Sequence, residues 1–566
     1  MRRFLVVLVL LTSVSAPLAP GYGQRQTRKG KSTAASNAHG GAGLITSDQL
    51  KSYLYFIASD AMAGRDTPSP GLDATANFIA MNLAKWGFKP AGDDGGFFQK
   101  IALQRERLDA DNTRAEFKGR QLKFGVDFLA SARNSGTGLG QLVYVGDGWV
   151  IKNKDINPYK NIDVKDKVIV YNGGILPKGV SFNEIRGGKD GADYFSPLMY
   201  AQTHGAHGAI VVPTKQILEN WDTAVHRVGE RGTLSVTRLA PPREINLPVI
   251  TASGSLLGQL FHEEPHDSSD IISRRAANNP ADAFALNPSK TISLTVADRP
   301  EEEKTQNIVA VFEGSDPVLK NEYVAVGAHY DHVGTGQPGS GRLPAKPGGD
   351  TKDSIYNGAD DDGSGTTAIL AMAEAVSHNG IRPKRSLLFV WHCGEEKGLW
   401  GSDYFTRFPT VPLDHIVTQL NIDMIGRSRL AGDTNPLNAE LSGPDEIFVI
   451  GSRMMSAELG DLSESVNKSF LKVYFNYKFD DPADPNRFFY RSDHYNYARN
   501  GIPIIFYFDG VHEDYHRASD SPDKIDYHKM EKVARTVYAT MWELANRAVR
   551  VRVDKEIPSQ LKNGDE

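Results

Sequence analysis

Short apolar segments alternate with amphipathic, helix-like segments from Thr305 to the C-terminus. The apolar runs cover residues 308–312, 323–327, 386–391, 416–422, 447–450 and 504–508. One helical stripe follows a capping residue, Asp362 or Ser364, and another extends from Met530 to Leu544. This alternation predicts an α/β fold with a mixed, mostly parallel β-sheet that is flanked by helices on both faces.

A different pattern covers residues 120–300, where short β-type runs are separated by turns rich in Gly, Pro and Asp. We therefore predict a mainly-β module at 120–300, inserted into a larger domain. The N-terminal part of that domain covers 46–119, with two amphipathic helices, and its main part covers 301–552. Residues 553–566 are expected to form a polar tail.

The N-terminus carries two arginines, an apolar run from Phe4 to Leu11 and then small residues. This pattern predicts a signal peptide at 1–23 and export to the bacterial periplasm or the medium, without a stable membrane anchor. The polar, glycine-rich stretch 24–45 is expected to be a flexible linker. Cys393 is the single cysteine, which excludes an intramolecular disulfide. The net charge of −5 provides no cationic surplus for binding nucleic acid.

Histidine and carboxylate side chains follow the ends of several predicted strands, where α/β folds commonly place metal ligands. They are His329, Asp331, Glu395, Glu396, Asp423 and His516. We expect His329 to bind a metal, and Asp331 to accept a hydrogen bond from the second ring nitrogen of His329 and so fix its tautomer. The set predicts a metallohydrolase.

Two groups of adjacent acids strengthen this hypothesis. Three aspartates, 360–362, lead into the helix that begins near Ser364, and capping requires only one of them. One of the three is therefore expected to be a metal ligand. Glu395 and Glu396 repel each other unless a cation or a shared proton intervenes, so one can bind metal while the other moves a proton.

Residues 512–516 match H-E-x-x-H, the zincin pattern, in which both histidines lie on one helix. A strand leads into this segment, and no helical periodicity follows it. We therefore expect no zincin site, and we place His512 near the ligands or in a loop.

Six segments together resemble the M28 family of co-catalytic zinc metallopeptidases: AHYDH, NGADDDGSG, CGEEKG, NIDMIG, RSDHYNYARNGIP and DYHRASDSPDKID. The segment Met62–Arg65 is similar to the start of that family's domain, and 120–300 resembles its protease-associated domain. The resemblance implies a zinc exopeptidase of the aminopeptidase type that acts on peptides or proteins.

The same resemblance implies two zinc ions per chain and assigns their ligands. Asp361 would bridge the two ions. His329 and Asp423 would complete one position, and Glu396 and His516 would complete the other.

Glu395 would then be the general base, with Asp331 as the second catalytic residue. Two alternatives stay open: a glutaminyl cyclase-like enzyme with one zinc ion, and a non-catalytic receptor or binding protein on the same fold. The sequence leaves the substrate side chain, the metal occupancy and the oligomeric state undetermined.

Overall fold

The computed structural model describes residues 38–185, 188–230, 232–336 and 353–556. The predicted signal peptide and residues 24–37 of the predicted linker lie outside the described residues, as do residues 557–566 of the predicted tail. Within the described residues, every helix is too short or too polar to cross a membrane.

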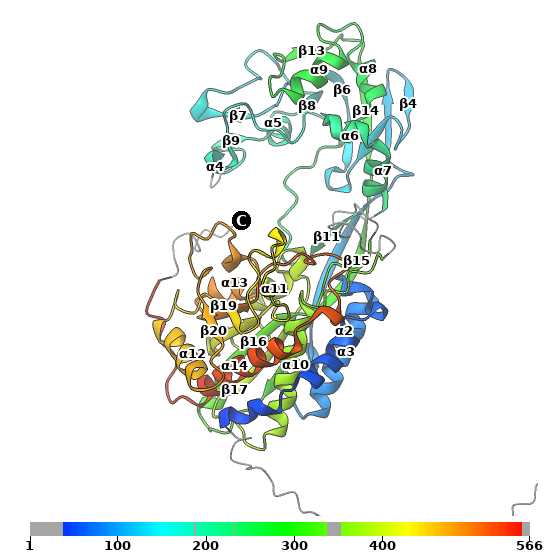
Figure 1. The fold of residues 1–566 in the computed structure, drawn as a ribbon. Coiled ribbons are helices and arrows are strands. Elements are labelled where there is room, and N and C mark those ends of the chain that lie inside the picture. The colour runs from blue at the N-terminus through cyan, green and yellow to red at the C-terminus, as the bar shows by residue number, and fades with distance from the viewer. Residues whose placement is uncertain (1–37, 186–187, 231, 337–352, 557–566) are drawn as a thin grey trace, which may run out of the picture.

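A ten-stranded sheet forms the larger lobe (Figure 1), with the path β11-β2-β15-β17-β16-β18-β21-β19-β20 and with β1 beside β15. The four central strands, β17, β16, β18 and β21, are parallel, and antiparallel strands flank them. The strands are β1 (Lys89–Pro90), β2 (Phe98–Leu108), β11 (Thr233–Val236), β15 (Asp298–Phe312), β16 (Tyr323–His329), β17 (Ser386–His392), β18 (Ile416–Ile422), β19 (Glu446–Ile450), β20 (Tyr474–Asn476) and β21 (Ile504–Phe508).

Helices cover both faces of this sheet because its strands bury apolar side chains on both sides. In β16, Val324 and Val326 pack into a core with α2, α3, α10, α12 and α14, while Ala325 packs into a second core with α11 and α13. The predicted α/β class is thus confirmed. The helices are α2 (Ser47–Ile57), α3 (Pro70–Lys85), α10 (Gly363–His378), α11 (Trp400–Arg407), α12 (Ala457–Ser469), α13 (His494–Ala498) and α14 (Tyr527–Asn546).

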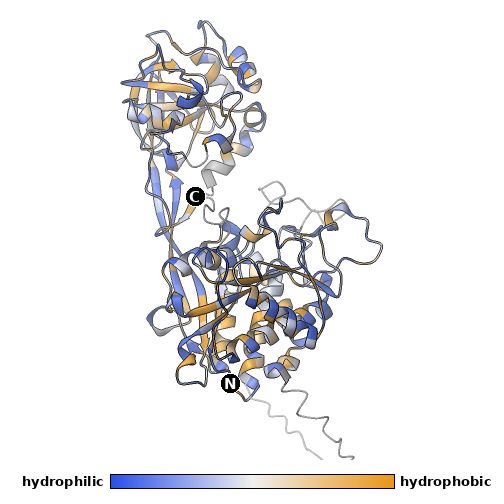
Figure 2. Cartoon of the chain, turned by 90° about the vertical axis from the view of Figure 1, so that its left-hand side faces the viewer, coloured by the Kyte–Doolittle hydropathy of each residue, from blue (hydrophilic) through white to orange (hydrophobic). Residues whose placement is uncertain are grey.

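A nine-stranded sheet with its own apolar core forms the second lobe, and Figure 2 shows apolar segments inside both lobes. Its strands are β3 (Arg114–Phe117), β4 (Arg120–Leu122), β5 (Phe128–Ala130), β6 (Gly136–Tyr144), β8 (Lys167–Asn172), β10 (Gly208–Val212), β12 (Val249–Ala252), β13 (Phe284–Ala285) and β14 (Thr291–Val296), and β7 (Val150–Ile151) pairs with β9 (Tyr194–Phe195). Its helices are α4 (Phe182–Ile185), α5 (Pro197–Thr203), α6 (Lys215–Glu219), α7 (Trp221–Glu230), α8 (Gly254–Leu260) and α9 (Ser268–Ala276).

Two long strands connect the lobes. β2 and β15 pair antiparallel from Phe98 opposite Ile308 to Leu108 opposite Asp298, and they extend out of the larger sheet toward the second lobe (Figure 1). The second sheet therefore begins with β3, slightly before the predicted boundary at residue 120. β11 lies within the predicted insert in sequence but pairs with β2 of the larger sheet.

The last residues of the predicted linker, 38–45, pack against α14. Ala42 and Ile45 are fully buried, and the Tyr538 hydroxyl donates a hydrogen bond to the Gly40 carbonyl. A Cβ at Gly40 would lie 2.0 Å from the Trp542 ring. The small residues that made this stretch resemble a linker instead permit its close approach to the helix.

A buried arginine ties the N-terminal helices to the loops after β16 and before α10. Arg65 is fully buried, and its guanidinium donates hydrogen bonds to four backbone carbonyls. Its acceptors are the carbonyl oxygens of Ile57, Tyr330, Asn357 and Gly358, at 2.7 to 3.0 Å. Arg65 thereby holds two functional loops at fixed positions.

Replacing Arg65 with methionine should lower the free energy of unfolding by about 3 kcal/mol or more, because it leaves several buried carbonyls without donors. Urea unfolding of the chelator-treated protein would measure this loss. Arg407→Met is the matched control: Arg407 pairs with Asp403 at the helix surface, and its loss should cost under about 1 kcal/mol. Equal losses for the two variants would contradict the anchoring role of Arg65.

Candidate metal centre

The predicted ligands meet at one edge of the larger sheet, where its parallel strands end. His329 is the last residue of β16, and Asp423 directly follows β18. Glu396 lies in the turn after β17, and His516 lies in the loop after β21. Asp361 stands just before α10. The carboxyl ends of parallel strands are the usual location of ligand sites in α/β sheets.

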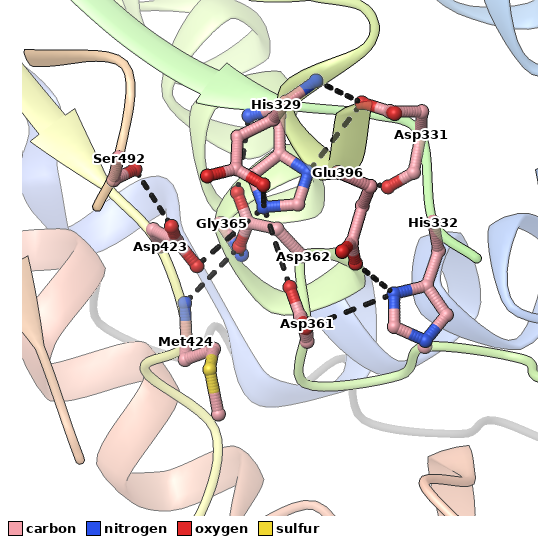
Figure 3. A network of polar contacts seen from close by, with 12 residues as sticks. His329, Asp331, His332, Asp361, Asp362, Gly365, Glu396, Asp423, Met424 and Ser492 are labelled. Atoms are coloured by element: carbon pink, nitrogen blue, oxygen red, sulfur yellow. Dashed lines mark hydrogen bonds and ion pairs between the residues drawn. The ribbon is translucent and has the colours of Figure 1, made fainter. Parts of the chain in front are cut away.

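Asp361 lies between two groups of possible ligands (Figure 3). Its Oδ1 atom is 3.3 Å from His329 Nε2, which is also 3.6 Å from Asp423 Oδ1. Its Oδ2 atom is 3.0 Å from His516 Nε2, and that nitrogen is 3.0 Å from Glu396 Oε2. All five predicted ligands are thus brought together, with one carboxylate shared between two donor groups.

Asp360 and Asp362, the other two acids of the triplet, are bound to backbone amides. Asp362 caps α10 through the Gly365 amide and also accepts from the amides of His329 and Met424. Asp360 accepts from the Gly426 amide at 2.7 Å. Of the two predicted capping residues, Asp362 and Ser364, Asp362 caps the helix, and of the three aspartates only Asp361 belongs to the donor groups.

The two predicted catalytic residues lie beside these groups. Glu395 Oε2 is 4.0 Å from His329 Nε2, and the Glu395 amide donates to Asp331 Oδ1 at 3.2 Å. Asp331 also faces His329 Nδ1, but its backbone carbonyl, at 3.2 Å, is closer than its carboxylate, at 3.6 Å. Asp331 therefore positions both the histidine and the Glu395 turn.

Burial and mutual repulsion shape the acidity of the cluster. Burial raises the pKa of Glu395 well above its usual value; the His329 charge opposes this rise, while Glu396 and Asp423 add to it. Burial alone would lower the pKa of His516, but the charges of Glu396 and Asp361 raise it to about 11. A cluster with this excess of carboxylates is stabilised by any cation that replaces the protons on the histidines.

The donor chemistry fits zinc. Buried nitrogen and oxygen atoms at the centre lack hydrogen-bond partners within the described residues, and they include His329 Nε2, Asp361 Oδ2 and Glu396 Oε1. Such orphaned atoms are costly unless an ion or water satisfies them. Imidazole and carboxylate donors suit Zn²⁺, which binds both at roughly 2.0–2.2 Å.

His512 is turned away from this centre. Its Nε2 atom lies 3.2 Å from Asp360 Oδ2, with both side chains fully buried. Residues 511–520 form turns rather than a helix, so His512 and His516 do not lie on one helical face. The zincin arrangement is absent, as expected, and His512 supports the aspartate triplet through Asp360.

Sequence reasoning assigned no role to His332. This histidine lies in the loop after β16, and its Nδ1 atom is 2.8 Å from Glu396 Oε1. Its spacing of three residues from His329 was the only sequence signal that placed it near the same centre. Asp493 and His494, in the segment RSDHYNYARNGIP, both have partners outside the two donor groups: Asp493 pairs with His392 at 3.3 Å, and His494 stacks on Phe506.

A pocket opens directly beside the centre. Asp361, Glu395 and Asp423 form one wall. Its remaining lining is largely apolar and consists of Met424, Phe488, Phe506, Phe508 and Val511, together with Arg491 and Tyr515. The pocket therefore presents hydrophobic surface next to the carboxylates.

Comparison with known proteins agrees with this geometry. Residues 307–541 match the model of peptidase family M28. This segment belongs to peptidase family M28. The M28 segment contains every residue of both donor groups, and it includes the four parallel strands and α10 that position them.

Curated relatives match part of this chain. The chain is 30% identical over 229 residues to a "probable leucine aminopeptidase 2" of Aspergillus oryzae, a match that covers 39% of this chain and 37% of the relative. It is 35% identical over 121 residues to "Leupeptin-inactivating enzyme 1" of Streptomyces exfoliatus, covering 21% and 22% of the two chains. The chain thus spans well under two thirds of the length of these relatives.

Among solved structures, an aminopeptidase from Aneurinibacillus sp. strain AM-1 aligns over 92% of this chain and 98% of its own. The TM-score is 0.50 and the sequence identity is 16%, so the likeness concerns the fold. It extends beyond the M28 segment and therefore includes parts of both lobes.

The loop before α10 passes close to the metal centre, and we expect its backbone at position 358 to require glycine. The φ of Gly358 is +56°, and a Cβ there would lie 2.3 Å from the Asp361 carbonyl oxygen and 2.4 Å from His332 Cγ. Gly358→Ala should therefore destabilise the protein by about 1–3 kcal/mol more than Gly380→Ala. Gly380 is the matched control, since its φ is +75° but it has open space around it.

Both free energies would be measured by urea unfolding in the presence of chelator, so that metal binding does not contribute. Gly380→Ala isolates the cost of a left-handed backbone for an L-residue, roughly 1–2 kcal/mol. Equal destabilisation by the two alanines would show that the crowding at Gly358 is relieved by small shifts.

Proposed function

We propose that this protein is a zinc-dependent aminopeptidase that holds two zinc ions and removes apolar residues from the N-terminus of peptides. The observation that carries the proposal is the position of Asp361 between two donor groups, with Glu395 and an apolar pocket beside them. The name of the A. oryzae relative agrees with a peptidase activity. We also propose export, on the basis of the N-terminal sequence pattern alone.

Each side chain has a defined task in this proposal. His329 and Asp423 would hold one ion, Glu396 and His516 would hold the other, and Asp361 would be shared between them. Zinc bound by these donors supplies Lewis acidity, which lowers the pKa of water toward neutrality and polarises a peptide carbonyl.

Glu395 performs the proton transfer. Its carboxylate lies within 4.0 Å of a proposed ligand and lines the pocket, so a substrate carbonyl in the pocket mouth lies within its reach. Glu395 takes a proton from the attacking water and passes it to the leaving amine nitrogen as the peptide bond breaks.

The pocket accounts for exopeptidase action on an apolar residue. Phe488, Phe506 and Phe508 give the pocket an apolar lining that favours contact with a hydrophobic side chain, and the acidic wall lies beside them. Glu395, the one carboxylate of this wall that is not a proposed ligand, attracts a protonated α-amino group. This favours an aminopeptidase.

Two complete donor groups also favour the two-ion enzyme over both alternatives. A cyclase-like enzyme with one ion requires only one group, and a non-catalytic binding protein has no need of Glu395. The chain retains both groups and the glutamate.

Glu395→Gln should leave the zinc content at two ions per chain while kcat falls by about 10²–10⁴-fold or more, since only the proton-transfer group is lost. The measurements are zinc per chain by elemental analysis and hydrolysis of a leucyl chromogenic amide. Glu543→Gln, an exposed change on α14, is the control for substitution as such. A Glu395→Gln variant with full activity would rule out this base.

The apolar pocket should make kcat/KM at least about tenfold higher for leucyl than for lysyl or aspartyl amides, because a charged side chain is not solvated there. Val511→Asp should reduce kcat/KM for the leucyl amide with unchanged zinc content. Val549→Asp is the matched control, since Val549 is 64% exposed. Equal rates on all three substrates would show that this pocket does not hold the substrate side chain.

A further inference from the structure

His332 is held rigidly against the metal centre although sequence analysis assigned it no role. Its side chain is completely buried, and its backbone N–H donates to the Arg65 carbonyl at 3.1 Å. Its ring packs directly on the backbone of Gly358, where a Cβ would overlap with the ring. Two separate segments of the chain therefore fix the direction of the imidazole.

The Nδ1 atom of His332 points at the donor group that contains Glu396 and His516 (Figure 3). It lies 2.8 Å from Glu396 Oε1 and 3.7 Å from Asp361 Oδ2. The other Glu396 oxygen, Oε2, is 3.0 Å from His516 Nε2. Donor atoms of a tetrahedral zinc ion with bonds of roughly 2.0–2.2 Å lie about 3.3–3.6 Å apart, a spacing within the range of these separations.

A simple hydrogen bond does not explain the close approach of His332 to Glu396. Neither His332 Nδ1 nor Glu396 Oε1 has a hydrogen-bond partner within the described residues, so their 2.8 Å contact lacks hydrogen-bonding geometry. The same unsatisfied state is found at His329 Nε2 and Asp361 Oδ2, two atoms already placed at the centre. His332 Nδ1 thus resembles the proposed ligand atoms in burial, direction and lack of partners.

We propose that His332 Nδ1 is a sixth ligand of the metal centre and binds the ion held by Asp361, Glu396 and His516. The inference rests on the proposed zinc centre. It makes the two positions unequal, because this ion has four protein donors whereas the ion at His329, Asp361 and Asp423 has three. Closed four-donor sites are typical of tightly held zinc, and three-donor sites leave a position for water or substrate.

The sharpest test replaces His332 with asparagine, whose side-chain amide keeps a polar donor near Glu396 but is a poor zinc ligand. Competition with a chromophoric chelator would measure both zinc affinities. His332→Asn should weaken one of the two by more than about a hundredfold, beyond the roughly 10–100-fold cost of losing a hydrogen-bond partner. His378→Asn, at an exposed position on α10, is the control.

A second measurement needs no variant. In a crystal structure of the zinc-loaded protein, Nδ1 of His332 should lie about 2.0–2.1 Å from an ion. A separation above about 3 Å, or unchanged zinc affinities in His332→Asn, would overturn the inference while leaving the two-ion proposal intact. Failure of the unmodified protein to bind two zinc ions would instead refute the proposed function.

Discussion

Electrostatic repulsion among buried carboxylates is the constraint on which the structure of this site depends. Asp361, Glu395, Glu396 and Asp423 lie within one small region at the edge of the larger sheet, with little or no exposed surface. Bringing such groups together is unfavourable unless positive charge compensates. Protonated histidine side chains provide part of this charge, and the donor geometry fits metal ions that would replace those protons.

Hydrogen bonds to the backbone of the surrounding loops stabilise this arrangement of acids. Asp360 and Asp362 are bound to backbone amides, and Asp520 accepts from the amides of Asp360 and Asp361 at 3.0 to 3.2 Å. Arg65 holds the neighbouring loops through their carbonyl oxygens, whereas the aspartates hold them through N–H groups. The acids that organise the loops are thus the ones whose side chains accept hydrogen bonds from backbone amides, and the other acids face the centre.

Much of the fold follows from local patterns. The limits of β18 and β21 agree with the apolar runs at 416–422 and 504–508, and Asp362 caps α10 as its sequence indicates. Local patterns failed where a segment depends on a distant partner. Residues 38–45 have the composition of a linker, yet they pack on α14, and β11 joins the larger sheet from within the inserted region.

The sequence by itself determined the class of the fold, the strand ends that carry imidazoles and carboxylates, and the five residues proposed as ligands. The first two depend on hydrophobic periodicity and on residue type, both of which are visible along the chain, whereas the choice of the five ligands depends on the resemblance of their motifs to the M28 family. Only the tertiary structure decided which acids turn toward backbone amides, how His332 is directed at Glu396, and which apolar residues line the pocket. Those outcomes depend on contacts between loops far apart in sequence, such as the loops after β16 and β21, and no local pattern encodes their relative positions.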